Sequence, residues 1–205
     1  MATDNRPVAV LLAGGLARRM GGGDKPLRLL AGKPLLDHVI ARIAPQAIAL
    51  VLNANGDPAR FAAWRLPVAA DTVAGFAGPL AGVLAGMRWA QGHYPGVADI
   101  LSVPTDTPFL PHDLAARLAH GRAAAGCALA CAMTAGRTHP VAALWPVALA
   151  DALEAALLAG ERKIDTWTAG HGIAEVDFPC PGYDPFFNVN HPDELAEAER
   201  IAAQA

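Results

Sequence analysis

The chain has 205 residues, a formal net charge of −3 and 53% hydrophobic residues. This length predicts one domain, residues 1–205, with a full hydrophobic core. The charge excludes the strongly basic surface of a nucleic-acid-binding protein. No apolar run approaches the roughly eighteen residues of a membrane span. The first residues also lack the apolar core of a signal peptide, so we expect a cytoplasmic protein.

Hydrophobic patterns and turn residues along the chain predict alternating strands and helices. The predicted strands are 8–13, 47–53, 67–70, 99–103, 127–134, 140–145 and 172–177. The predicted helices are 35–44, 59–64, 80–91, 113–122, 147–159 and 192–203. Repeated strand–helix units favour an α/β fold with three layers, α/β/α, and a mostly parallel sheet.

A glycine-rich segment follows the first predicted strand, and residues 8–26 read VAVLLAGGLARRMGGGDKP. Glycines allow backbone N–H groups to converge on one point, and such a nest binds phosphate. Arg19 and Lys25 add positive charge that suits a polyphosphate. The alternative is a flexible turn with solvated arginines. Neither G-x-x-x-x-G-K-S/T nor G-x-G-x-x-G is present, so the segment is neither an ordinary P-loop nor an ordinary dinucleotide loop.

Polar residues stand where further predicted strands end: Asn53, Asp71 and Asp106. In a parallel sheet, ligands bind outside the carboxyl ends of the strands. Taken alone, each of these residues is more often a turn or cap residue. Together with the glycine-rich segment they predict one site, in which Asp106 binds Mg²⁺ that bridges phosphate oxygens.

These residue types suit nucleotidyl transfer. The reaction needs in-line attack at the α-phosphorus and neutralisation of the leaving pyrophosphate. Backbone N–H groups, Arg19, Lys25 and Mg²⁺ at Asp106 would supply that charge. An attacking phosphate is already ionised near neutrality, so no protein base is required. None of the seven histidines is therefore assigned a catalytic role.

The glycine-rich segment resembles the signature L-A-G-G-x-x-x-R-M-G-G-x-D-K of the molybdenum cofactor guanylyltransferase family, from Leu12 to Lys25. The resemblance continues in N-A-N at 53–55, G-P-L-A-G at 78–82, D-T-P at 106–108, H-P at 139–140 and N-V-N at 188–190. It implies a Rossmann-like nucleotidyltransferase fold of the nucleotide-diphospho-sugar transferase type. It also implies transfer of GMP from GTP to molybdenum-bearing molybdopterin, with release of pyrophosphate.

The resemblance assigns roles to individual residues. It implies Arg19, Lys25 and Asp106 as catalytic residues, and Asp106 as the ligand of a Mg²⁺ cofactor. The expected GTP-binding residues are Leu12, Ala13, Gly14, Gly15, Gly22, Lys25, Asn53, Asp71, Gly78 and Asp106. Either Asp71 or Asn53 is expected to contact guanosine, because a carboxylate accepts both N–H donors of guanine.

Asn188 and Asn190 are the candidate pterin-binding residues. They are two apart, so on an extended strand both face the same side, and two amides suit a polar pterin. The alternative is a turn in which Asn190 caps the last helix, and both interpretations stay open.

Three other interpretations compete with guanylyl transfer. Cytidylyltransferases acting on the same pterin read L-A-A-G where this chain reads L-A-G-G, from Leu12 to Gly15. Glycine in place of alanine removes a Cβ beside the expected base, which favours the larger purine base. Sugar-phosphate nucleotidyltransferases share the fold but not the N-x-N and G-G-x-D-K motifs. A non-catalytic carrier of the cofactor would need no metal-binding Asp106. Delivery could follow catalysis, so contact with cofactor-insertion proteins and apo-molybdoenzymes is the second role that we consider.

The three cysteines, Cys127, Cys131 and Cys180, are interpreted as buried thiols.

Overall fold

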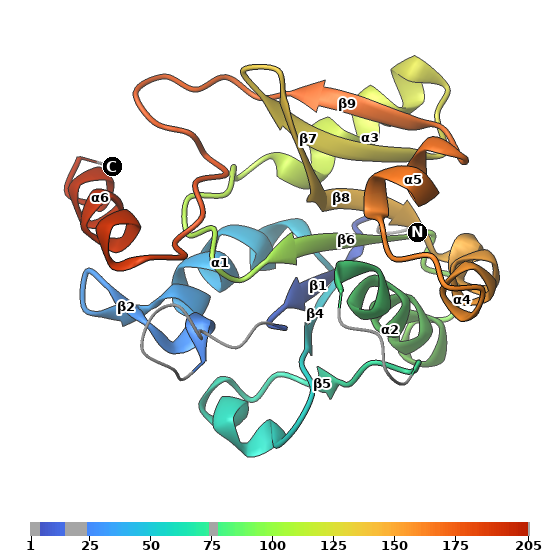
Figure 1. Ribbon diagram of the computed structural model, residues 1–205, viewed down its shortest axis with the longest axis horizontal. Coiled ribbons are helices and arrows are strands. Elements are labelled where there is room, and N and C mark those ends of the chain that lie inside the picture. Colours follow the sequence, from blue (N-terminus) through green and yellow to red (C-terminus); the bar gives the residue numbers. More distant parts are fainter. Residues whose placement is uncertain (1–4, 15–23, 74–77, 205) are drawn as a thin grey trace.

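The computed structural model describes residues 5–14, 24–73 and 78–204, and Figure 1 shows a central sheet with helices on both faces. The main sheet of these residues has the strand order β5-β4-β1-β6-β8-β7-β9. The strands are β1 (Val8–Leu12), β4 (Ala49–Asn53), β5 (Val68–Ala69), β6 (Asp99–Pro104), β7 (Leu129–Thr134), β8 (Arg137–Pro146) and β9 (Ile173–Asp177). Neighbouring strands are parallel except that β8 is antiparallel to both β6 and β7, which confirms the mostly parallel sheet.

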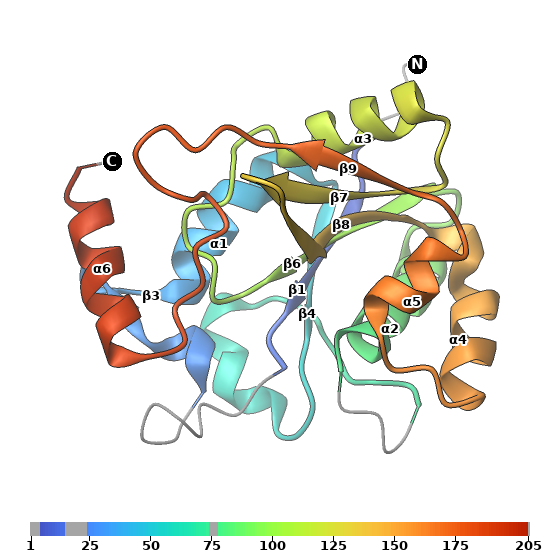
Figure 2. The ribbon, with the colours of Figure 1, turned by 45° about the horizontal axis from the view of Figure 1, so that its top comes forward.

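The helices cover the two faces of this sheet unequally. They are α1 (Leu35–Ile43), α2 (Pro79–His93), α3 (Leu114–Ala125), α4 (Ala150–Leu158), α5 (Ile164–Ala169) and α6 (Pro192–Ala202). α1 and α3 pack in one core layer, and α2, α4 and α5 pack in the other. Figure 2 shows α3 on the opposite side of the sheet from α2, α4 and α5. The predicted three-layer architecture is therefore confirmed.

β1 lies between β4 and β6 in the sheet, and its sequence explains its place. Successive strand residues point to opposite faces, so Ala9 and Leu11 enter the layer of α1 and α3, while Val8 and Val10 enter the layer of α2. α2 lies close to the strand because it carries glycine at the contact. A Cβ on Gly86 would lie 2.3 Å from Val10 Cγ2.

A third, smaller cluster lies at the side of the molecule where the chain ends. There α6 packs against a short hairpin of β2 (Leu29–Leu30) and β3 (Lys33–Pro34), with Leu30, Val189 and Ile201 in the contact. The sequence patterns did not predict this hairpin, because two-residue strands are too short for alternation to be visible. The cluster is important for the site, since it positions the residues just before α6.

Several element predictions need correction. The predicted helix 59–64 is a 3₁₀ helix, η4 (Pro58–Trp64), and the predicted helix 147–159 is η5 (Val147–Leu149) followed by α4. α5 was not predicted. Further 3₁₀ turns are η2 (Lys25–Leu27) and η3 (Ala44–Gln46).

Among the cysteines, only the burial of Cys131 is confirmed. Cys180 is exposed and Cys127 is half-buried, because both lie in connecting segments outside β7. All three are free thiols. Within the described ranges, no helix has the length and apolar character needed to span a membrane.

Candidate functional site

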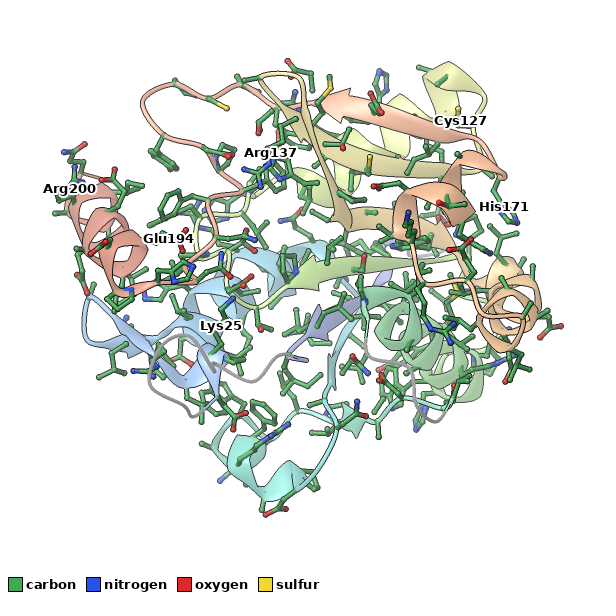
Figure 3. All side chains as sticks on the ribbon, in the orientation of Figure 1. Lys25, Cys127, Arg137, His171, Glu194 and Arg200 are labelled. Carbon is green, nitrogen blue, oxygen red and sulfur yellow. The ribbon has the colours of Figure 1, made fainter. Side chains whose placement is uncertain are left out.

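Lys25 is the residue on which three distant segments converge. It begins η2, whose geometry is fixed by the buried Pro26 at the start of the turn. Its Nζ lies 2.6 Å from Asp106 Oδ2, across 81 residues of sequence. The same ammonium donates a hydrogen bond to Oδ1 of Asn190, 165 residues away. Figure 3 shows Lys25 beside the segment that leads into α6, where Glu194 lies.

Asp106 follows the carboxyl end of β6 and is held there by its neighbours. Thr105 Oγ1 donates to the carbonyl of Leu12 at 3.1 Å, which ties the end of β6 to the end of β1. The amide of Val189 donates to the carbonyl of Asp106 at 2.9 Å, which ties it to the segment before α6. These contacts fix the backbone, so the carboxylate position is defined by the sheet.

One oxygen of the Asp106 carboxylate is buried without a hydrogen-bond partner. Among the described residues, Oδ1 has no donor, while Oδ2 is paired with Lys25. A buried carboxylate oxygen without a protein donor costs free energy unless an ion, water or ligand satisfies it. The geometry therefore leaves an acceptor for a hard cation beside the Lys25 ammonium.

Asp71, Asn53 and Asn55 form a second cluster, at the ends of β4 and β5. Asn53 Nδ2 donates to Asp71 Oδ1 at 2.9 Å, and Asn55 Nδ2 donates to Asp71 Oδ2 at 2.7 Å. The Asp71 amide donates in return to Asn55 Oδ1 at 2.9 Å. Both carboxylate oxygens are thus held by amides, and the spacing of the two asparagines in N-x-N is the sequence signal for this arrangement.

The orientation of Asn53 depends on a further donor bond and on a glycine. Its Nδ2 also donates to the carbonyl of Ala69 at 3.1 Å, so both amide protons are used. A Cβ on Gly82 would lie 2.3 Å from Asn53 Oδ1 and 2.6 Å from Leu12 Cδ2. The first turn of α2 therefore packs directly on Asn53. This contact requires glycine at position 82, the last residue of G-P-L-A-G.

The other predicted nucleotide-binding residues are placed as follows. Leu12 ends β1 and is half-buried, Ala13 is buried and its N–H donates to the carbonyl of Asn53, and Gly14 is exposed. Gly78 is exposed and precedes the first residue of α2. Gly15, Arg19 and Gly22 lie outside the described residues. The structure thus brings the ends of β1, β4, β5 and β6 together with the start of α2, as predicted.

For Asn188 and Asn190, the alternative in which Asn190 caps the last helix is wrong, while their role in pterin binding stays a prediction. Residues 188–190 lie in no strand, and Asn188 is exposed while Asn190 is half-buried with its side chain on Lys25. The cap of α6 is His191, with Glu194 accepting from the amides of His191 and Asn190. Asn190 therefore reaches the lysine site. Sequence spacing gave no signal for that contact.

A polar cluster anchors the segment that carries Asn190. Thr134 Oγ1 donates to Asp184 Oδ1 at 3.3 Å, and Asp184 Oδ1 also accepts from the amide of Phe186 at 2.8 Å. A hydroxyl has one proton, so the 2.7 Å contact between His139 Nε2 and Thr134 Oγ1 requires the histidine to donate. His139 also stacks on Phe186, with ring centroids 4.6 Å apart.

His139 is held in its uncharged form by this environment. Burial lowers the pKa of His139 below its ordinary value of 6.5, Asp184 opposes that shift, and Arg137 adds to it. The cluster thus joins the β7–β8 hairpin to the segment before α6 through a neutral imidazole. The H-P motif at 139–140 marked this position, but its spacing gave no indication of the partner.

Comparisons with known proteins identify the family of this chain. Residues 9–175 match the family of the MobA-like NTP transferase domain. Two relatives are named molybdenum cofactor guanylyltransferase. The protein of Rhodopseudomonas palustris strain BisB5 is 57% identical, over 98% of this chain and 97% of the relative. That of Bradyrhizobium sp. strain ORS 278 is 56% identical, over 95% of this chain and 92% of the relative.

A solved structure extends the similarity to the fold. The crystal structure of molybdopterin-guanine dinucleotide biosynthesis protein A from Archaeoglobus fulgidus matches with a TM-score of 0.75 and 26% identity. The match covers 97% of this chain and 100% of that one. The sheet and helices described above are therefore those of a nucleotidyltransferase fold.

Proposed function

The chain belongs to the molybdenum cofactor guanylyltransferase family, and we propose that it transfers GMP from GTP to molybdenum-bearing molybdopterin. The second product is pyrophosphate. A phosphate oxygen of the pterin forms a bond to the α-phosphorus of GTP. The bond from that phosphorus to the bridging oxygen breaks, and its electron pair leaves with pyrophosphate.

One observation carries this proposal: Lys25, Asp106 and Asn190 converge at the carboxyl ends of the strands, where the Asp106 Oδ1 is buried and unpartnered among the described residues. A lysine ammonium offers several donors and a full positive charge, which suits oxygens of a triphosphate. In-line displacement depends mainly on positioning and on neutralising the leaving group. Lys25 is fixed by its two partners and is therefore preorganised for that task.

Asp106 also fits a magnesium ion, which we propose as the cofactor. Proteins usually bind Mg²⁺ through roughly one or two carboxylates, and water and substrate phosphate oxygens complete the coordination shell of the ion. Asp106 offers that carboxylate. In the described part of the chain, no three histidine, cysteine or acidic side chains form a metal-binding group, so a magnesium site here would be completed by the substrate. When bound, the ion would neutralise charge on the phosphates.

The Asp71 cluster is proposed to recognise the nucleoside. Asn53 and Asn55 each donate to one oxygen of the Asp71 carboxylate, which orients it. Each carboxylate oxygen can accept more than one hydrogen bond, so Asp71 can still accept from neighbouring N–H donors of guanine. Asn53 has no amide proton left for the ligand, because Ala69 and Asp71 accept both. Of the two candidates, Asp71 is the better one.

The test is nucleotide binding by calorimetry with Mg²⁺, followed by pyrophosphate release in the presence of GTP and molybdenum-loaded molybdopterin. We expect GTP to bind in preference to CTP and ATP, and Lys25→Ala to weaken binding and abolish turnover. Lys163→Ala is the matched control, because Lys163 is an exposed lysine at the N-terminal cap position of α5. A preference for CTP would point to cytidylyl transfer. GTP binding without pyrophosphate release would point to a carrier.

A further inference from the structure

Arg60 connects the two halves of the candidate site, although no sequence motif singled it out. It lies in η4, and its Nη1 is 3.1 Å from Asp24 Oδ1. Its Nη2 donates to the backbone carbonyl of Asn55 at 2.6 Å. The guanidinium lies over the ring of the buried Phe61, 4.9 Å from the centroid. The ion pair is partly buried, with 26% and 17% of the two side chains exposed.

The partner of Arg60 poses an electrostatic problem for a triphosphate site. Asp24 immediately precedes Lys25, so a second carboxylate is carried one residue away from the lysine that is proposed to bind phosphates. An unpaired carboxylate there would repel the triphosphate and would compete with it for Lys25. At partial burial these charges are weakly screened, so the effect would be large. A positive group on Asp24 removes both penalties.

The second contact of Arg60 reaches the nucleoside side. The Asn55 backbone accepts from Arg60, and the Asn55 side chain holds Asp71 from two directions. A guanidinium can serve both contacts because its donors are rigidly spaced in one plane, which a lysine ammonium cannot reproduce. The Arg60 Nε is buried without a partner among the described residues, so the two Nη groups make the contacts that place this side chain.

We propose that Arg60 is a positioning residue for the transfer reaction, and this inference rests on the proposed function. It neutralises Asp24, so that Lys25 is directed to the triphosphate. It also ties the lysine-bearing turn to the asparagine that holds Asp71. Arg60 thereby holds the triphosphate half and the nucleoside half of the site in a fixed relative position.

The experiment is a double-mutant cycle of Arg60→Met and Asp24→Asn. Methionine retains an apolar stem over Phe61 but removes the charge. Truncating one partner of a partly buried pair penalises mainly the charge left behind, so Arg60→Met should weaken tripolyphosphate and GTP binding by about tenfold. Asp24→Asn alone removes the charge at its source and should change either affinity by less than about threefold. The double variant should recover to the level of Asp24→Asn.

Recovery in the double variant separates positioning from a structural role. If Arg60 only supported the fold, the double variant would be at least as impaired as Arg60→Met, and that result would overturn the proposal. Unchanged affinity in Arg60→Met would overturn it as well. Arg65→Met is the matched control, since Arg65 is an exposed arginine at the end of the same η4. Melting temperatures of all variants identify any that are misfolded.

The choice of two probes separates this proposal from the proposed function. Tripolyphosphate reports on the phosphate half alone. If the wild-type protein binds tripolyphosphate but not GTP, guanylyl transfer is contradicted, while the double-mutant cycle can still be measured with tripolyphosphate. Arg60→Lys adds a finer test. It restores the charge but not the planar fork, so tripolyphosphate affinity should recover more than GTP affinity. Equal recovery of both would contradict the link to Asn55.

Discussion

Asp106 pairs one carboxylate oxygen with Lys25 and leaves the other buried without a partner among the described residues. Asp106→Asn keeps the shape of the side chain but removes the negative charge that would hold Mg²⁺. We expect kcat to fall by about 10²- to 10³-fold, the cost of losing one preorganised electrostatic contact to the transition state. Pyrophosphate release measured against Mg²⁺ concentration is the test.

The same measurement on Asp113→Asn provides the control. Asp113 is an exposed aspartate that precedes α3 without a side-chain cap. It should retain wild-type turnover and wild-type Mg²⁺ dependence. If Asp106→Asn kept both as well, Asp106 would be a turn residue and the magnesium assignment would be wrong.

Substitution of Gly82 has a specific expected effect on stability and nucleotide preference, because this glycine packs directly against Asn53. An added Cβ would lie 2.3 Å from Asn53 Oδ1, so Gly82→Ala must displace that amide or the start of α2. Overpacking of this kind costs about 1–3 kcal/mol of stability. Since Asn53 holds Asp71, the preference for GTP over CTP should fall together with the stability. Urea denaturation and nucleotide calorimetry measure the two effects.

Gly92 in the same helix gives the comparison for Gly82. A Cβ there has no atom within 4 Å. Gly92→Ala should therefore be neutral or stabilise the protein by up to about 1 kcal/mol through helix propensity. Loss of stability in both variants would mean that α2 rejects alanine for a general reason and that the Asn53 contact is not decisive.

At the scale of elements, the β7–β8 hairpin and the segment before α6 are joined through a histidine that must stay neutral. Burial lowers the pKa of His139 below 6.5, with Asp184 opposing and Arg137 adding to the shift. The unfolded chain therefore binds this proton more readily than the folded protein. Stability is present above the unfolded pKa and is lost as the pH falls from about 6.5 toward the lowered folded value.

His139→Gln should flatten this pH dependence, because glutamine keeps a donor for Thr134 and does not titrate. The free energy of unfolding, measured in urea from pH 7.5 to pH 5, should fall more steeply for wild type than for the variant. His120→Gln is the control, since His120 is an exposed residue on α3. Identical slopes for wild type and His139→Gln would show that the hairpin cluster does not sense pH.

Sequence patterns predicted the elements that are long enough to show a hydrophobic pattern. β1, β4 and β6 are largely buried runs. The polar residues at the end of β4 and just after β6, Asn53 and Asp106, predicted that these strand ends lie together. The β2–β3 hairpin and α5 contain too few residues for a period to be recognised, and they were missed. The error on η4 has a similar origin, since seven residues beginning with proline satisfy both α and 3₁₀ hydrogen-bonding patterns.

At the scale of the whole molecule, contacts between distant segments could not be predicted from sequence. The strand-end rule gathers Asn53, Asp71 and Asp106 because parallel strands present their carboxyl ends at one edge. Nothing comparable links Lys25 to Asn190, which are 165 residues apart and meet only because α6 packs on the β2–β3 hairpin. Arg60 is an example of the same limit: its role depends on a contact with Asp24 made only in the folded chain.

Cys131 offers a test of whether this molecule unfolds as one unit. It is buried in β7, where burial raises the pKa of its thiol to about 12, with Glu175 and Asp165 adding to the shift. At pH 8 the native thiol is therefore protonated and inaccessible. It should react with a maleimide only after opening, while the exposed Cys180 should react at once. Mass spectrometry of the labelled peptides distinguishes the sites.

Nucleotide binding should then protect Cys131 from a distance. The proposed GTP site lies at β1, β4 and β6, while β7 lies beyond β8 in the sheet. A ligand at a hundred times its dissociation constant stabilises the folded state by about 2.7 kcal/mol. If β7 opens only by global unfolding, GTP with Mg²⁺ should slow Cys131 labelling by about a hundredfold, because that free energy acts on the opening equilibrium. Cys180 labelling should not change. Unaltered Cys131 labelling would instead mean that β7 and β9 open as a separate unit, so that nucleotide binding stabilises only its own half of the sheet.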